Sequence, residues 1–168
     1  QRNVFQLRGK SVIVGVDCGL TGAVSLIDEM EGTYFSVVDI PTSQSASSSR
    51  KVKNEINPSG LREIFATIPV PSIAVVERTS AMPGQGVSSM FSMGDSFGVV
   101  RGVLSALCVP VIYVPPMVWK KHFKIGSDKE RARALAIAYF PTAPLERKKD
   151  HNRAESLLLA RWYYETRK

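Results

Sequence analysis

The feature that most constrains this chain is a short apolar run that ends on a carboxylate. Residues 12–16 are β-branched apart from one glycine, which is typical of a buried central strand, and Asp17 follows directly. Burying an ionised carboxylate costs free energy, so the Asp17 side chain must stay in water, pair with a cation or bind a metal. Gly19 and Gly22 permit a sharp turn beside it. The alternative is that Asp17 only begins this turn.

Two further carboxylates occupy comparable positions. Glu77 ends the apolar run 73–76, and Glu155 lies just before the apolar run 156–160. Three acids at the ends of core elements repel one another unless a cation gathers them, and Mg²⁺ is the usual ion because it prefers oxygen ligands. Two such ions can bind the attacking and leaving oxygens of a phosphodiester. The pattern therefore favours a metal site formed by Asp17, Glu77 and Glu155.

Four sequence blocks together are specific enough to compare with a known family. In chain order they are VGVDCGLTGA, VVERTSAMPGQGVSSMFSMG, VPPMVWKKHF and KKDHNRAESLLLA, and they extend over most of residues 11–162. They resemble the RuvC-type Holliday junction resolvases, in the branch that includes phage and chloroplast enzymes. The resemblance implies a ribonuclease-H-like fold and a homodimer that cuts four-way DNA junctions with Mg²⁺ or Mn²⁺.

Periodicity and turn signals predict a single α/β domain over residues 1–168, with a central five-stranded mixed sheet flanked by helices. Residues 1–10 are expected to be an N-terminal extension, and the serine-rich segment 41–57 a mobile loop. The order of elements matches the ribonuclease-H-like pattern. The expected strands are 11–17, 23–27, 33–39, 73–77 and 110–114, and the expected helices are 59–68, 87–107, 128–139 and 151–164.

The basic charge is concentrated in the last third of the chain. Residues 119–168 contain 13 basic and 6 acidic side chains, whereas residues 1–118 contain nine of each. This distribution fits a surface that faces a polyanion, and the alternative is an ordinary solvated basic face. Phosphate contacts of this kind position a nucleic acid without reading its sequence. The residues assigned to this role are Lys121, Lys124, Arg131, Arg147, Lys148, Lys149 and Arg153.

Cysteine use and hydropathy indicate an intracellular protein. Cys18 and Cys108 both lie beside apolar runs and are expected to be reduced packing residues, because two cysteines make no disulfide framework. No run approaches the roughly 20 apolar residues of a membrane span. The chain begins at Gln1, which fits either a trimmed sequence or a removed targeting segment. The expected location is an organelle matrix, of a mitochondrion or chloroplast, or otherwise a bacterial or phage-infected cytoplasm.

The last predicted helix adds a fourth candidate to the site. His151 and Glu155 are four residues apart and therefore share a face. An imidazole beside a carboxylate can bind a metal or orient an attacking water, and the alternative is that His151 only hydrogen-bonds near the helix start. The resemblance implies a ligand ahead of the final carboxylate. We assign that role to His151, with Asp150, a candidate N-cap, as the second choice, because Asn152 is a poor Mg²⁺ ligand.

Lys120 follows the strand predicted at 110–114 and is expected on the same edge as the carboxylates. A lysine near a scissile phosphate can neutralise charge that builds up in the transition state. The resemblance implies a lysine after this strand. The alternatives are ordinary solvent exposure or the same role for Lys121, and Trp119 is expected to pack beneath the site instead of stacking on a base.

The segment 81–91 contains a proline and two glycines and then hydroxyl side chains that suit a helix start. A helix N-terminus with hydroxyls can hold a phosphate. The resemblance implies that this region reaches the centre of the junction, although its methionine and phenylalanine could equally be core residues. The candidates for contact with nucleic acid are Met82, Gln85, Ser88, Ser89 and Phe91.

These observations favour a metal-dependent endonuclease that resolves four-way DNA junctions. The proposed catalytic residues are Asp17, Glu77, Lys120, His151 and Glu155. A second hypothesis is a nucleic-acid-binding scaffold with the same fold, such as an organelle ribosome assembly factor that binds rRNA. A third is a ribonuclease-H-like enzyme that acts on RNA or hybrids. The intact set of acids favours an enzyme, because a scaffold does not need buried carboxylates.

Overall fold

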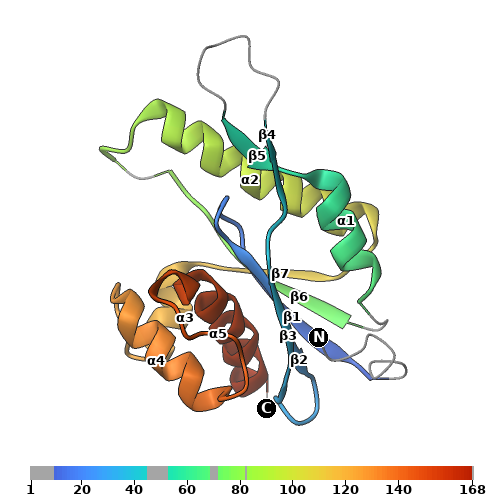
Figure 1. Cartoon of the computed structure of the whole chain (residues 1–168), viewed down its shortest axis with the longest axis vertical. Helices are drawn as coiled ribbons and strands as arrows, with labels where there is room; N and C mark the ends of the chain where they lie inside the picture. Colours follow the sequence, from blue (N-terminus) through green and yellow to red (C-terminus); the bar gives the residue numbers. More distant parts are fainter. Residues whose placement is uncertain (1–9, 45–52, 69–71, 82, 168) are drawn as a thin grey trace.

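The computed structural model describes residues 10–44, 53–68, 72–81 and 83–167, and it has an α/β architecture (Figure 1). The strands are β1 (Val12–Asp17), β2 (Ala23–Asp28), β3 (Tyr34–Asp39), β4 (Thr42–Gln44), β5 (Asn54–Ile56), β6 (Ser72–Glu77) and β7 (Val111–Val114). The helices are α1 (Pro58–Ala66), α2 (Val87–Ala106), α3 (Pro116–His122), α4 (Lys129–Tyr139) and α5 (His151–Thr166), and a 3-10 turn, Lys148–Asp150, precedes α5.

Five strands form the central sheet in the order β3-β2-β1-β6-β7. β1 pairs antiparallel with β2 and parallel with β6, and β7 pairs parallel with β6. Helices α1 and α2 cover one face of this sheet, and α3, α4 and α5 cover the other (Figure 1). The mixed five-stranded sheet with flanking helices that the sequence predicts is therefore confirmed.

The two apolar layers follow the alternation of side chains along β1. Ile13 packs on the side of α4 and α5, whereas Val14 and its neighbours two residues away pack on the side of α1 and α2. Gly15 lies on the same side as Ile13. A β carbon at Gly15 would come within 1.9 Å of the carbonyl oxygen of Ser156. The missing side chain therefore lets the backbone of α5 lie directly on β1.

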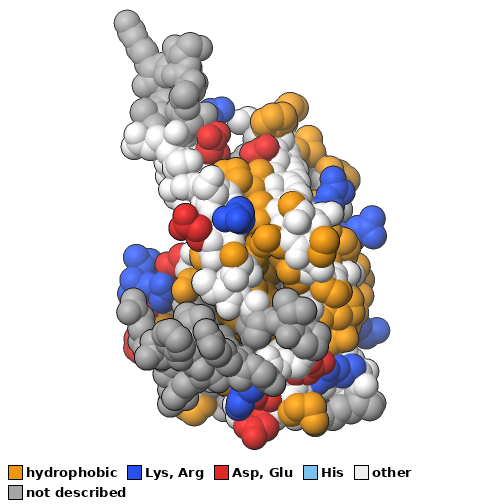
Figure 2. Space-filling view, turned by 90° about the vertical axis from the view of Figure 1, so that its right-hand side faces the viewer, with side chains coloured by type: hydrophobic (Ala, Val, Ile, Leu, Met, Phe, Trp, Pro, Cys, Tyr) orange, Lys and Arg blue, Asp and Glu red, His pale blue; other side chains and the backbone are white. Residues whose placement is uncertain are grey.

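The α1–α2 layer reaches the surface at one side of the molecule. Val99, Val103 and Leu107 of this layer are partly buried and pack against the core from its margin. Figure 2 looks onto the side where α1 and the end of α2 lie, and apolar side chains gather there among scattered lysines and arginines. No helix within the described residues has the length and hydropathy needed to cross a membrane.

The predicted element bounds agree with the structure to within two residues, but three elements are missing from the prediction. Strands β4 and β5 pair antiparallel, so the prediction of a mobile loop over 41–57 is wrong at both ends of that segment. Residues 45–52, and residues 1–9 of the predicted extension, lie outside the described residues. The sequence does not predict helix α3, because Pro115 and Pro116 suggest a turn. Pro116 nevertheless occupies the first position of the helix, where proline is well tolerated.

The two cysteines differ in their surroundings. Cys18 is buried beside the end of β1, as expected for a packing residue. Cys108 is exposed and has a φ of 55°, just after α2 ends, so its assignment to the core is wrong. The apolar run 109–112 suggested burial, but the chain reverses direction at Cys108 and turns this side chain outward.

Candidate active site

Strand pairing places Asp17 and Glu77 side by side. β1 and β6 are parallel neighbours in register, so both end at the same edge of the sheet, on these two residues. Because side chains alternate along a strand, Asp17 lies on the same face as Gly15, and Glu77 lies on the same face as Val75. Val75 packs in the core layer of α5. Both carboxylates therefore lie on the face that α5 covers.

Helix α5 brings the third carboxylate to this edge. Ser156 lies against Gly15, two residues before Asp17, and Glu155 directly precedes Ser156. The Glu155 residue is 8% exposed, so it is buried at the sheet edge and not directed into open solvent. The three carboxylates singled out from the sequence thus converge from two parallel strands and one helix.

The convergence of negative charge changes how these acids ionise. Burial, and then repulsion from Glu77 and Glu155, raises the pKa of Asp17 to about 7 from an ordinary value of 3.8. A hydrogen bond from the Gly19 backbone and the charge of Lys120 act in the opposite direction. Burial also raises the pKa of Glu77. The three acids at this edge therefore carry more negative charge than Lys120 balances. Such an excess is typical of sites that bind a cation or transfer a proton.

Two consecutive residues of α3 are bonded to two of the three acids. The indole N–H of Trp119 donates to Glu77 Oε2 at 2.8 Å, and Lys120 Nζ donates to Glu155 Oε1 at 2.9 Å. Trp119 is fully buried, which confirms that it packs beneath the site. Lys120 lies on the carboxylate edge as predicted, whereas Lys121 is exposed. The Trp119 contact with Glu77 was missed, and an indole directly before Lys120 is the signal that could have indicated it.

The donor set suits a hard divalent cation, but its present arrangement does not enclose one. Carboxylate oxygens are the ligands that Mg²⁺ prefers. Within the part of the chain that the structure describes, no three His, Cys, Asp or Glu side chains are placed to hold a metal ion together. Glu77 and Glu155 are instead bonded to Trp119 and Lys120. Lys120 and Trp119 thus compete with a cation for one oxygen of Glu155 and one of Glu77.

Comparison with curated proteins finds a resolvase. Holliday junction resolvase MOC1, chloroplastic, of Chlamydomonas reinhardtii is 33% identical to the chain over 98 residues. The match covers 56% of the chain and 11% of that protein, so the chain spans a small part of the length of the relative it matches. No protein-family model matches the chain.

Comparison with solved structures covers nearly the whole chain. A structure of T. thermophilus RuvC in complex with Holliday junction substrate has a TM-score of 0.62 at 15% identity, over 94% of this chain and 95% of that one. The chain has the fold of RuvC. A second Thermus thermophilus RuvC structure has a TM-score of 0.55 at 16% identity, over 93% and 95% of the two chains. The predicted resemblance to RuvC and the predicted ribonuclease-H-like fold are confirmed.

At the start of α5 in this RuvC fold, His151 and Asp150 contact partners other than the three acids. The His151 ring nitrogens lie 3.1 Å from Lys129 Nζ and 3.1 Å from the Lys148 carbonyl oxygen. Asp150 accepts the Arg147 backbone N–H at 2.8 Å and pairs with the Arg147 guanidinium at 2.7 Å, which lowers the pKa of Asp150. Asp150 is the N-cap residue of α5 as expected, but its carboxylate accepts from Arg147 in the 3-10 turn and makes no capping bond to α5. Metal ligation by His151 or Asp150 stays a prediction.

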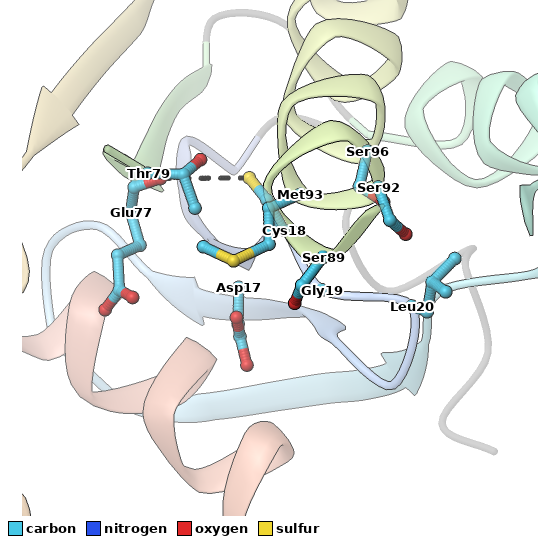
Figure 3. A pocket seen from close by; sticks show the side chains of 10 residues that line it. All are labelled: Asp17, Cys18, Gly19, Leu20, Glu77, Thr79, Ser89, Ser92, Met93 and Ser96. Atoms are coloured by element: carbon cyan, nitrogen blue, oxygen red, sulfur yellow. Dashed lines mark hydrogen bonds between the residues drawn. The ribbon is translucent and has the colours of Figure 1, made fainter. Parts of the chain in front are cut away.

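A cleft of about 320 Å³ opens on the α2 side of this sheet edge, and the carboxylates of Asp17 and Glu77 point away from its α2 wall (Figure 3). It lies between the turn after β1, the end of β6 and the first half of α2. The Cys18 thiol in its wall donates to the Glu77 carbonyl oxygen at 3.9 Å, which is the dashed line in Figure 3. The residues that line it are Asp17, Cys18, Gly19, Leu20, Glu77, Thr79, Ser89, Ser92, Met93 and Ser96.

The candidates in the segment 81–91 lie around this cleft. Ser89 lines it, and Gln85 Nε2 donates to the thioether of Met93, another lining residue, at 3.4 Å. Ser88 is exposed. Phe91 is 77% exposed, so the alternative that it belongs to the core is wrong. Met82 lies outside the described residues, and contact of the other four with nucleic acid stays a prediction.

The basic candidates differ in what they already bind. Arg153 is bonded to both carboxylate oxygens of Asp39, at 2.5 and 2.7 Å, and Arg147 is bonded to Asp150. Lys121 and Lys124 line an open hollow of about 720 Å³ beside α3. The exposed candidates are Lys121, Lys124, Arg131, Arg147, Lys148 and Lys149. Among these candidates, Arg153 has its charge most fully neutralised by a partner within the protein, Asp39.

Proposed function

We propose that this chain is a structure-selective, Mg²⁺- or Mn²⁺-dependent endonuclease that resolves four-way DNA junctions. The observation that carries the proposal is the convergence of Asp17, Glu77 and Glu155, with Lys120, at one edge of a RuvC fold. The names of the relatives support it, since one is a Holliday junction resolvase and the other is RuvC bound to a Holliday junction. Four-way DNA is accordingly the proposed substrate.

The roles of the residues follow from their chemistry. Asp17, Glu77 and Glu155 would hold the cation, with His151 or Asp150 as the further ligand. When bound, the ion would supply Lewis-acid chemistry that lowers the pKa of water and neutralises phosphate charge. Lys120, once released from Glu155, would face the cleaved phosphate, where its positive charge stabilises the developing negative charge. Trp119 would keep Glu77 oriented by its 2.8 Å hydrogen bond.

Two matched cuts in one junction require two active sites, and we propose a homodimer formed through α2. Gly94, Gly98 and Gly102 follow one another at four-residue intervals, and a β carbon at any of them would meet nothing within 4 Å. The same face carries Val87 and Phe91, which are 80% and 77% exposed. An apolar, glycine-lined helix face can approach its own copy closely around a two-fold axis.

The dimer is tested by sedimentation equilibrium. Gly98→Arg should give a monomer where the wild type gives a dimer, because a long charged side chain would enter the contact. Ala138→Arg adds the same charge at an exposed position of α4, on the opposite face of the sheet from α2. Equal masses for the wild type and both variants would refute this interface.

The cleavage assay uses a labelled four-way junction, a matched linear duplex and structured RNA, each with Mg²⁺ and with Mn²⁺. The wild type should cut the junction alone. Asp17→Asn and Glu77→Gln should abolish cutting and leave junction binding intact or tighter, because removing negative charge does not weaken docking of phosphates. Tight RNA binding without any cutting would favour the scaffold hypothesis instead.

The proposed location is an organelle matrix, which the chloroplast relative supports.

A further inference from the structure

Helix α3 carries two residues of the proposed site, but its beginning is weakly anchored. The helix has seven residues, and its first turn exposes Met117 and Val118. Its N-cap residue, Pro115, makes no side-chain capping bond. Trp119 is fully buried and anchors the middle of the helix. Because a single anchor leaves rotation about it free, a second contact is needed to fix the direction in which Lys120 points.

That second contact joins the last residue of α3 to the last turn of α5. His122 Nε2 lies 2.8 Å from Glu165 Oε2. The two side chains are 33% and 24% exposed, so water and salt screen this pair less than a pair on the open surface. The His122 ring also packs edge-on against Phe123, with 4.8 Å between the ring centroids. This packing restricts the ring to orientations that present Nε2 to Glu165.

Glu165 joins α3, α4 and α5, which lie on one face of the sheet (Figure 1). Arg161 donates to its Oε1 at 2.7 Å, and Tyr139 of α4 forms a further side-chain hydrogen bond with it. The Arg161 guanidinium lies over the rings of Tyr139 and Tyr164, 4.4 and 5.0 Å from their centroids. Burial acts to raise the pKa of Glu165, but the hydrogen bonds from His122 and Arg161 lower it, so the carboxylate is charged at neutral pH. The end of α3 thus meets a fixed, charged acceptor.

The two bonds between α3 and α5 lie far apart along α5. Lys120 bonds to Glu155, and His122 bonds to Glu165. These two acids are ten residues apart in α5, a separation of about 15 Å along a helix axis. One bond would let α3 rotate about it, whereas two bonds at separate points fix its orientation as well. The bond at His122 therefore helps to determine where the Lys120 amine lies.

We propose that His122 and Glu165 are positioning residues for cleavage, and that their bond, called the α3–α5 clamp below, holds Lys120 and Trp119 at the acids. The clamp acts through α3 and makes no contact with the phosphate or the cation. The inference rests on the proposed function, because Lys120 has its role only if the chain cuts DNA. The geometry that the clamp fixes is nevertheless present without metal or DNA.

Two substitutions of His122 separate the effect of the bond from that of the ring. His122→Phe keeps a ring against Phe123 and removes the N–H, whereas His122→Gln removes the ring and keeps an N–H donor for Glu165. If the bond positions α3, His122→Gln should behave as the wild type and His122→Phe should not. Glu29→Gln is the matched control, because Glu29 pairs with Arg167 at the same end of α5 but lies beside β2.

The first measurement is nuclear magnetic resonance of the Trp119 indole N–H, without metal or DNA. The chain has two tryptophans, so Trp162→Phe identifies the Trp119 signal. In His122→Phe this N–H should exchange with solvent about tenfold faster, because its bond to the charged Glu77 is loosened. His122→Gln and Glu29→Gln should leave the exchange rate unchanged. An unchanged rate in His122→Phe, or an equal rise in Glu29→Gln, would overturn the proposal.

The second measurement is single-turnover cleavage of a labelled four-way junction. At saturating protein, His122→Phe should cut about 10–10²-fold more slowly with unchanged junction affinity, since a displacement of about 1 Å from the productive geometry has this effect. His122→Gln should restore the rate, and Glu29→Gln should keep it. A loss of affinity with an unchanged rate would make His122 a phosphate contact and refute its positioning role.

A double variant tests whether the two residues of the clamp act as one. Glu165→Ala should slow cutting at least as much as His122→Phe. The combination of both should be no slower than Glu165→Ala alone, because the bond between them is already lost. Additive losses would show that the two residues act independently and would contradict the clamp.

The two levels of the hypothesis fail differently. A wild type that cuts no junction refutes the proposed function, and the exchange of the Trp119 indole N–H then decides the clamp by itself. A wild type that cuts junctions, and does so no faster than His122→Phe, refutes the clamp and leaves the resolvase proposal standing.

Discussion

Asp17 differs from Glu77 and Glu155 because neither Trp119 nor Lys120 donates a hydrogen bond to its carboxylate. Glu77 is bonded to an indole N–H and Glu155 to an ammonium group, whereas the Asp17 pKa of about 7 reflects burial and repulsion by both neighbours. An acid with this pKa loses its proton at neutral pH when a cation arrives. The proposed cation would therefore release a proton from Asp17 when it binds.

The raised pKa of Asp17 predicts a pH dependence of stability in the absence of metal. The folded state holds the Asp17 proton more tightly than the unfolded state, so the stability that this proton confers is present below pH 4 and is lost as pH rises through about 7. Relative to Asp17→Asn, the wild type should lose free energy of unfolding over this window, below a limit of about 4 kcal/mol. Urea unfolding in chelator at several pH values measures it. A constant difference between wild type and Asp17→Asn would contradict the raised pKa, and the exposed Asp95→Asn is the control.

Lys120 is predicted to affect metal binding and cleavage in opposite directions. Its amine is bonded to Glu155 Oε1 and so competes with a cation for that carboxylate. Lys120→Ala should therefore bind Mn²⁺ more tightly, as calorimetry would detect, yet cut roughly 10²–10³-fold more slowly because the charge opposite the phosphate is lost. Lys121→Ala should change neither quantity much. Equal small effects of both substitutions would remove Lys120 from the mechanism.

Among the elements, α5 and α3 determine the geometry of the site. α5 lies directly on β1 because Gly15 has no side chain, and this contact sets the position of Glu155 relative to Asp17. α3 follows β7 and turns Trp119 and Lys120 back onto the acids. The site is thus assembled where two helices meet the carboxyl ends of two parallel strands.

Gly15→Ala tests the contact between α5 and β1. The added methyl would lie 1.9 Å from a backbone oxygen, which cannot move without shifting the helix, so a loss of roughly 3 kcal/mol or more is expected. Gly98→Ala adds the same methyl in open space on α2 and should stabilise the monomer by about 0.5–1 kcal/mol. Denaturant unfolding measures both. A mild effect of Gly15→Ala would mean that α5 can move freely on the sheet.

The whole molecule combines a neutral first part with a basic last third. Residues 119–168 carry an excess of seven positive charges over negative ones, and they include the end of α3 and all of α4 and α5, on one face of the sheet. Arg153 and Arg147 are partly used in ion pairs that hold the start of α5. That residues 1–168 form one domain stays a prediction.

Exposed lysines before α5 should contribute to junction binding through salt-sensitive interactions with phosphates. The double variant Lys148→Ala with Lys149→Ala should lower the slope of log affinity against log salt by roughly 0.9 for each phosphate that the protein no longer neutralises. Its cleavage rate at saturating protein should be unchanged. Lys53→Ala with Arg62→Ala removes two exposed charges near α1 as a control. An equal slope change in the two double variants would indicate diffuse charge without a defined binding face.

By itself, the sequence determined the order of the main strands and helices, the acids at their ends and the lysine after the last strand. These properties depend on periodicity within a few residues, and an alternating apolar run ending on Asp17 or Glu77 carries that information locally. The resemblance to RuvC then indicated how the ends come together.

The tertiary structure alone decided which side chains bond to which acids. The hydrogen bond between Trp119 and Glu77, the occupation of Glu155 by Lys120 and the exposure of Cys108 each depend on segments distant in sequence or on a turn of the backbone. The same holds for the cleft along the first half of α2 and for the buried Thr79 hydroxyl, which has no hydrogen-bond partner among the described residues. Packing between distant elements fixes such rotamers and voids, and no local pattern of residues encodes them.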